Sequence, residues 1–164
     1  MGRSAGDPGI VGKTVNLKLR SRIGYVDLVH ELAQDLARGA RFAKPAALNI
    51  GLAVREAFIN AIKHGNNMND EKLVEVNFEQ NAEHFRVRVR DEGPGFDWTK
   101  TADPRADENL FLSSGRGIFF MKHFVDHVAF QCSRGKGTEV VLEKRLEMAK
   151  GHDRGNGELK GRKG

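Results

Sequence analysis

The alternation of polar and apolar side chains predicts several strands. Residues 14–19, 73–78 and 85–89 have a period of two, which is typical of strands with one buried face. The four residues 80–83 separate the second run from the third and predict a hairpin. Two more strands are expected at residues 127–132 and 138–142, on either side of a glycine-rich turn.

Three other segments have the spacing of amphipathic helices. In residues 25–41, Leu28, Leu32 and Leu36 recur every four positions, with Val29 and Ala33 beside them. A second helix is expected to begin near the proline at position 45 and to end near residues 64–67, where Gly and Asn favour a left-handed backbone. A third helix is expected from residue 117 to about 124. The buried stripe predicted for the second helix consists of Ile50, Ala53, Val54, Ala57, Phe58 and Ala61.

The order of these elements predicts one α+β domain. A strand, two helices, a hairpin, a helix and a last hairpin suit a two-layer α/β sandwich, with a mostly antiparallel sheet and its helices on one face. Residues 92–114 show no sustained periodicity, and long loops of this kind in compact domains are typical of functional lids. We therefore expect a flexible N-terminus (1–12), one folded domain (13–147) and a disordered basic tail (148–164).

Composition and charge narrow the possible functions. The net charge of +5 comes from the ends: residues 1–24 hold five Lys/Arg against one acidic residue, and residues 144–164 hold seven against three. The middle then carries 15 basic and 18 acidic residues, which argues against direct nucleic-acid binding by the folded part. A lone cysteine, Cys132, excludes an internal disulfide and a cysteine zinc cluster. The absence of a membrane span or secretory signal leads us to expect a cytoplasmic protein.

Glu56 and Asn60 are the first candidate pair for chemistry. Residues four apart stack on one side of a helix, and these two flank the predicted buried stripe. An amide oxygen suits Mg²⁺, and a carboxylate can accept the proton of an attacking hydroxyl or water. A solvated helix flank would also explain this pair.

Two glycine-containing segments are candidates for nucleotide contacts. Asp91 follows a strand directly, so its carboxylate could accept a hydrogen bond from the amino group of adenine, and Gly93 and Gly95 would allow a ligand close to the backbone. Gly115 and Gly117 would open the third helix with exposed N–H groups, which suit phosphate. A turn at a strand end and a flexible entry to a helix are the structural alternatives.

The order of four motifs resembles the boxes of the GHKL ATPases, which have the Bergerat fold. The motifs are EAFINAIKHGN, DEGPGFD, SGRGIFFMKHFVD and GKGTEV, and the resemblance spans about residues 14–146. Within that superfamily the chain is most similar to bacterial anti-sigma-factor serine kinases of the RsbW type.

The resemblance implies that residues 13–147 form an ATP-binding kinase domain with ATP and Mg²⁺ as cofactors. It also implies a role for each matching residue. Glu56 would be the catalytic base, Asn60 the Mg²⁺ ligand and Asp91 the adenine-binding residue. Where some members have an arginine before the lid's Ser-Gly, this chain has Leu112-Ser113-Ser114-Gly115, and Arg116 would meet the terminal phosphate instead. The remaining nucleotide contacts implied are Lys63, His64, Gly93, Gly95, Gly115, Gly117 and Thr138.

Three functions follow as hypotheses. The first is a serine/threonine-protein kinase and anti-sigma factor that phosphorylates a STAS-type antagonist, sequesters a sigma factor and forms a homodimer by analogy. The second is a nucleotide-gated binding switch without kinase activity. The third is a detached histidine-kinase catalytic domain.

Overall fold

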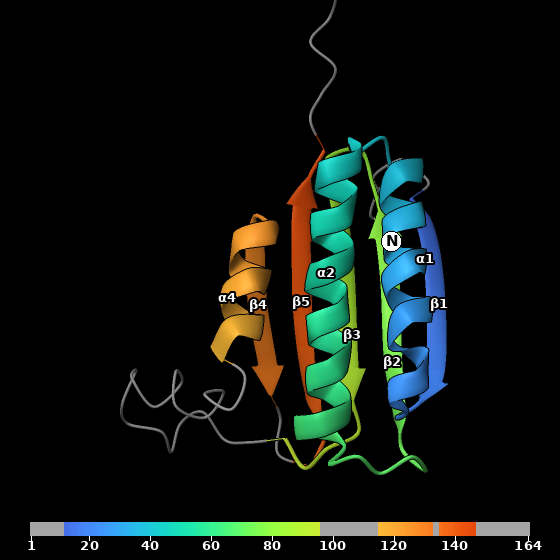
Figure 1. The fold of residues 1–164 in the computed structure, drawn as a ribbon, viewed down its shortest axis with the longest axis vertical. Coiled ribbons are helices and arrows are strands. Elements are labelled where there is room, and N and C mark those ends of the chain that lie inside the picture. Colours follow the sequence, from blue (N-terminus) through green and yellow to red (C-terminus); the bar gives the residue numbers. More distant parts are fainter. Residues whose placement is uncertain (1–11, 96–114, 133–134, 147–164) are drawn as a thin grey trace, which may run out of the picture.

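The protein folds into two layers, a sheet and a layer of helices (Figure 1). The computed structural model describes residues 12–95, 115–132 and 135–146. Three predicted segments lie wholly or mostly outside these ranges: the N-terminus 1–12, the lid within 92–114 and the tail 148–164. The elements are β1 (Lys13–Arg20), a 3-10 turn (Ile23–Tyr25), α1 (Val26–Gly39), α2 (Lys44–Asn60), a π-helical turn (Ala61–Gly65), β2 (Leu73–Gln80), β3 (His84–Asp91), α4 (Gly115–Phe124), β4 (His127–Cys132) and β5 (Thr138–Arg145).

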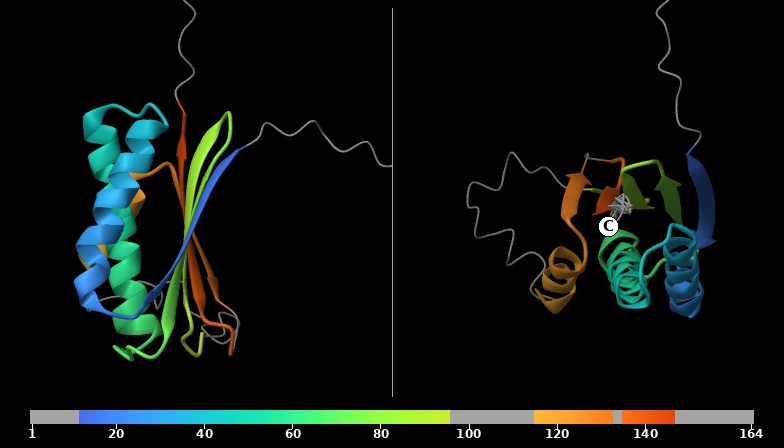
Figure 2. Two further views of the ribbon diagram at one scale, coloured as in Figure 1. Left: turned by 90° about the vertical axis from the view of Figure 1, so that its right-hand side faces the viewer. Right: turned by 90° about the horizontal axis from the view of Figure 1, so that it is seen from above.

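The sheet has the strand order β1-β2-β3-β5-β4, and each neighbouring pair is antiparallel. β2 and β3 form the predicted hairpin, with Val76 opposite Val89, and Val89 in turn lies opposite Val140 of β5. The described helices all cover the same face of the sheet (Figure 2). This arrangement confirms the predicted α+β sandwich.

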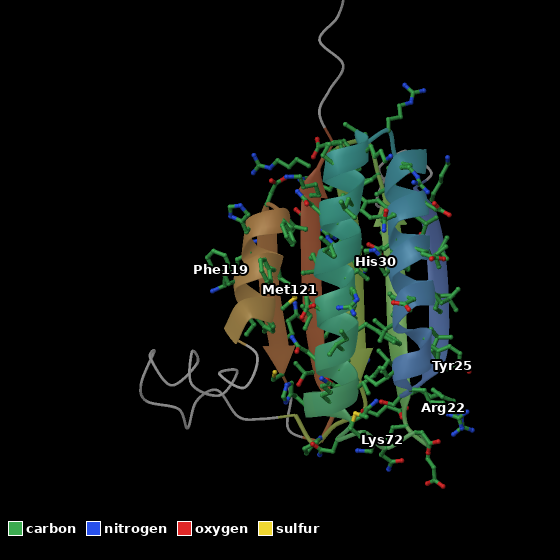
Figure 3. All side chains as sticks on the ribbon, in the orientation of Figure 1. Arg22, Tyr25, His30, Lys72, Phe119 and Met121 are labelled. Atoms are coloured by element: carbon green, nitrogen blue, oxygen red, sulfur yellow. The ribbon has the colours of Figure 1, made fainter. Side chains whose placement is uncertain are left out.

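The core lies between the sheet and the helices. The predicted stripe of α2 is buried in full, and Pro45 stands in the first turn of that helix as expected. Met121 of α4 is fully buried and points toward α2, whereas Phe119 projects outward and is 64% exposed (Figure 3). Among the described residues, no helix is long and apolar enough to cross a membrane.

The buried face of α1 includes the predicted Val29 and Ala33, but its centre lies one position away from the predicted leucine series. Its centre is Val29, Ala33 and Ala37, which are fully buried, while Leu28 is 53% exposed and the other two leucines are only partly buried. Both sets repeat every four residues, so periodicity alone did not separate two faces that are one position apart. The small side chains Val29, Ala33 and Ala37 pack into the core, and Leu32 and Leu36 lie at its edge.

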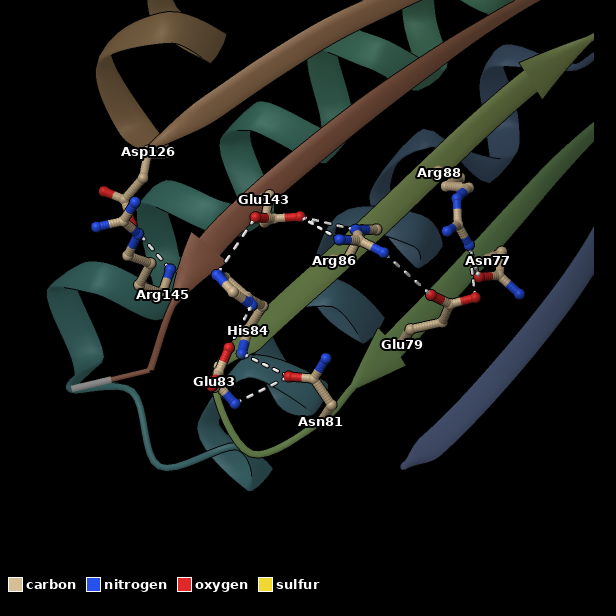
Figure 4. A network of polar contacts seen from close by, with 10 residues as sticks. All are labelled: Asn77, Glu79, Asn81, Glu83, His84, Arg86, Arg88, Asp126, Glu143 and Arg145. Atoms are coloured by element: carbon tan, nitrogen blue, oxygen red, sulfur yellow. Dashed lines mark hydrogen bonds and ion pairs between the residues drawn. The ribbon is translucent and has the colours of Figure 1, made fainter. Parts of the chain in front are cut away.

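The other face of the sheet carries an ion-pair network (Figure 4). Arg86 Nη2 lies 2.6 Å from Glu143 Oε2, Arg86 Nη1 lies 3.9 Å from Glu79 Oε2, and Arg88 also contacts Glu79. These side chains alternate along β3 with the buried apolar ones, as the strand prediction requires.

Candidate functional site

Asp91 is the last residue of β3 and faces the helices, with only 4% of its surface exposed. Its Oδ1 accepts hydrogen bonds from two backbone N–H groups, that of Gly93 at 2.8 Å and that of Thr138 at 3.0 Å. Thr138 therefore supports this carboxylate through its backbone, while its hydroxyl contacts Cys132 Sγ at 3.4 Å. With Oδ1 fixed in this way, Oδ2 is oriented toward Gly65 and is the oxygen left to accept from a ligand.

Three glycines enclose the Asp91 carboxylate. A Cβ at Gly65 would overlap Asp91 Oδ2, one at Gly93 would overlap the Gly65 carbonyl, and one at Gly137 would overlap the Asp91 carbonyl. Gly137 also has a φ of +79°, which L side chains rarely adopt. The backbone at these three positions thus packs directly against Asp91, where no side chain would fit. The motifs predict a ligand contact for Gly93, whereas Gly65 was expected only at a helix end and Gly137 only in a turn.

Burial raises the pKa of Asp91 above its ordinary value of 3.8, although the N–H groups of Thr138 and Gly93, with Lys72 and Arg90, oppose the shift. The folded state therefore holds this proton to a higher pH than the unfolded chain does. It follows that the ionised carboxylate destabilises the fold at neutral pH.

We therefore expect the wild type to lose stability relative to Asp91→Asn as the pH rises through the raised pKa of Asp91. Well below pH 3.8, position 91 is uncharged in both the wild type and the variant, whether folded or unfolded. Above the raised pKa, only the folded wild type carries a buried charge there. Urea denaturation of both proteins from pH 4 to pH 7 measures the difference in unfolding free energy. A difference that stays constant, or that grows in favour of the wild type, would show that burial does not control this group.

The second part of the site lies between α2 and α4. Glu56 is half-buried and Asn60 is 9% exposed, and both face the start of α4. A Cβ at Gly117 would lie 2.8 Å from Glu56 Oε2 and 3.9 Å from Asn60 Nδ2. Gly115 and Arg116 form the first two positions of α4. The predicted carboxylate, amide and helix N-terminus are therefore adjacent.

Lys63, His64 and Gly95 are three further residues predicted to contact the nucleotide. Lys63 and His64 are exposed on the π-helical turn that continues α2 beyond Asn60. Gly95 has a φ of +61° and stands at the end of a described range. No ligand contact of these residues is tested by the fold, so their roles stay predictions.

Asn66 supports the backbone next to Asp91, and the sequence motifs did not single it out. It is fully buried; its Oδ1 accepts from the N–H of Glu92 at 2.8 Å, and its Nδ2 donates to the carbonyl of Leu73 at 2.9 Å. Glu92 Oε2 in turn accepts from the N–H of Leu73 at 2.8 Å. Asn66 thereby ties the end of α2 to the turn that follows Asp91. Its position after a helix-ending glycine indicated a cap, and only the fold shows the long-range contacts.

The donor set fits ATP with Mg²⁺. Asp91 and its glycines suit adenine, and the N-terminus of α4 beside Glu56 suits phosphate. The described residues contain no group of three His, Cys, Asp or Glu that could hold a metal alone. Mg²⁺ commonly binds through one or two protein oxygens together with substrate phosphates, so the Asn60 amide is a suitable single protein ligand.

Gly117→Ala tests the closeness of α4 to the carboxylate. The new Cβ would lie 2.8 Å from Glu56 Oε2 and would displace that side chain, while alanine in a helix is favoured over glycine by about 1 kcal/mol. If phosphate binds at this helix end, we expect ATP affinity to fall about tenfold, since a shift of the candidate phosphate site would lose roughly one charge-assisted hydrogen bond. Calorimetric titration measures the affinity and urea denaturation the stability. Unchanged ATP binding in the folded variant would separate Gly117 from the phosphate site.

Comparison with known proteins agrees with this geometry. An anti-sigma F factor from Clostridium beijerinckii is 30% identical over 106 residues, covering 61% of this chain and 71% of that protein. A serine-protein kinase RsbW from Listeria monocytogenes is 25% identical over 142 residues, covering 81% of this chain and 90% of that protein. A family model described as a histidine kinase-like ATPase domain matches residues 19–144. The chain therefore belongs to the histidine kinase-like ATPase domain family, as the four motifs and the fold predict.

Proposed function

We propose that this protein is an ATP-dependent serine kinase that phosphorylates a STAS-type anti-sigma-factor antagonist and, when that antagonist is released, holds a sigma factor. The names of its relatives, an anti-sigma F factor and a serine-protein kinase, support this function. The observation that carries it is the Glu56 carboxylate facing the N-terminal turn of α4 at Gly117. A proton acceptor beside a phosphate-binding helix end is what transfer to a hydroxyl requires.

The proposed reaction assigns one task to each part of the site. Asp91 orients adenine, and the backbone N–H groups at the start of α4 bind phosphate oxygens. Glu56 accepts the proton as the serine oxygen bonds to the terminal phosphorus, while the bond from that phosphorus to the bridging oxygen breaks and ADP leaves. Mg²⁺, held by Asn60, would neutralise charge on the phosphates. Arg116, at the second position of α4, would add a guanidinium there.

Phosphate transfer distinguishes this function from its alternatives. The purified chain is incubated with radiolabelled ATP, Mg²⁺ and a STAS-type antagonist, and the labelled product is treated with acid. Acid-stable label on a serine of the antagonist supports the proposal. Acid-labile label, typical of phosphohistidine, would support a histidine kinase instead. Binding of the antagonist that depends on nucleotide, with no label transferred, would support the gated switch.

A further inference from the structure

Arg55 contacts the candidate proton acceptor, although the two residues are neighbours on a helix. Its Nη1 lies 3.4 Å from Glu56 Oε1, with 38% of the Arg55 side chain and 26% of the Glu56 side chain exposed. Successive helix residues point about 100° apart and do not face each other. The contact therefore requires the Arg55 side chain to bend over the surface of α2 toward the site.

The two oxygens of the Glu56 carboxylate face different groups. Oε1 is beside the guanidinium of Arg55, and Oε2 is oriented toward Gly117 at the start of α4. The cation is thus placed on the far side of the carboxylate from the phosphate-binding turn. A hydroxyl that approaches Oε1 therefore comes close to the same guanidinium.

The distances expected in the proposed reaction also place the terminal phosphate within reach of the Arg55 guanidinium. A hydroxyl that gives its proton to Glu56 lies about 3 Å from the carboxylate, and the phosphorus it attacks lies about 3–3.5 Å further. Rotation about the long Arg55 side chain spans this distance. Guanidinium groups match phosphate oxygens in charge and shape, and they form charge-assisted hydrogen bonds with them.

Other arginines near the middle of the fold are engaged elsewhere. Arg86 and Arg88 lie on the opposite face of the sheet and pair with Glu143 and Glu79 (Figure 4). The ion pair that Arg55 makes within the described residues is with the site carboxylate itself. Arg55 therefore differs from these cations in both position and partner.

We propose that Arg55 binds the terminal phosphate of ATP, and this proposal rests on the proposed function. When ATP is bound, the guanidinium moves from Glu56 Oε1 to an oxygen of the γ-phosphate. The exchange leaves the carboxylate oxygen to accept the serine proton and places a positive charge where negative charge develops during transfer. Arg55 would thus supply a second guanidinium at the terminal phosphate, in addition to the one proposed for Arg116.

The difference in affinity between ATP and ADP tests this contact without measuring catalysis. Wild type, Arg55→Gln and Arg55→Lys are titrated calorimetrically with each nucleotide in the presence of Mg²⁺. We expect the glutamine variant to lose about tenfold in ATP affinity, the size of one charge-assisted hydrogen bond, and to keep its ADP affinity within about twofold. The lysine variant should recover part of the ATP affinity because it keeps the charge.

Arg38→Gln is the matched control, because Arg38 is an exposed helix arginine paired with Asp35 on α1. It should bind both nucleotides as the wild type does. Equal losses for ATP and ADP in Arg55→Gln, or no loss for either, would overturn the role of Arg55 and leave the kinase proposal standing. Wild type that binds neither nucleotide would overturn both proposals.

Discussion

Asp91→Asn is expected to weaken ATP binding by at least about 30-fold while leaving the protein folded. The N–H groups of Gly93 and Thr138 both point at Oδ1, so the amide of the variant would place its oxygen there. Its NH2 group would then face Gly65 and the amino group of adenine, and two donors would meet in a buried site. Leaving such a group unpaired disfavours binding by about 1–3 kcal/mol, and losing a hydrogen bond to a charged acceptor adds about as much.

The stability of this variant makes the result interpretable. Because burial raises the pKa of Asp91, removing its charge should leave the unfolding free energy at pH 7 equal or higher. Asp126→Asn is a matched control: Asp126 accepts from Lys144 Nζ and the N–H of Arg145, both at 2.8 Å, away from Asp91. Calorimetry with ATP should show loss of binding in Asp91→Asn alone. Full binding by a folded Asp91→Asn would place adenine elsewhere.

The sequence was sufficient to predict every described strand and the order of the elements. Polar and apolar alternation marked β1, β2 and β3, and β4 was predicted with its observed bounds. The prediction was less accurate where two patterns share one period. On α1, periodicity did not show that Ala33 and its neighbours at four-residue spacing, rather than the leucines beside them, form the centre of the buried face. That choice depends on how closely two layers approach, which a single helix pattern does not contain.

The candidate site was predictable only as a set of motifs. The spacing of Glu56 and Asn60 placed both on one side of α2, and the fold adds that this side faces Gly117. The enclosure of Asp91 depends on backbone from the end of α2 and from the turn before β5, which are distant in the sequence. In the sequence, Gly65 and Gly137 therefore resemble ordinary turn residues. Only the fold shows that both pack against Asp91. The hydrogen bonds of Asn66 to Leu73 and Glu92 were not predictable for the same reason, because these residues lie 7 and 26 positions away in the sequence.

Glu56→Gln is expected to lower phosphate transfer about 10²–10⁴-fold, the usual contribution of a positioned acid or base. Glutamine has nearly the same size and still offers an oxygen, but it does not take up the serine proton at neutral pH. ATP affinity should change by less than about threefold, because the substitution alters neither the proposed adenine contact at Asp91 nor the helix N-terminus of α4. Single-turnover transfer from radiolabelled ATP measures the rate, and calorimetry measures the affinity.

The pattern across variants separates proton acceptance from nucleotide binding. Glu31→Gln, an exposed carboxylate of α1, should transfer phosphate at the wild-type rate and controls for the change in net charge. Asp91→Asn should lose binding and transfer together, whereas Glu56→Gln should lose transfer alone. If Glu56→Gln transferred phosphate as fast as the wild type, the proton would have to leave by another route. If it lost ATP affinity as Asp91→Asn does, Glu56 would shape the nucleotide site rather than accept the proton.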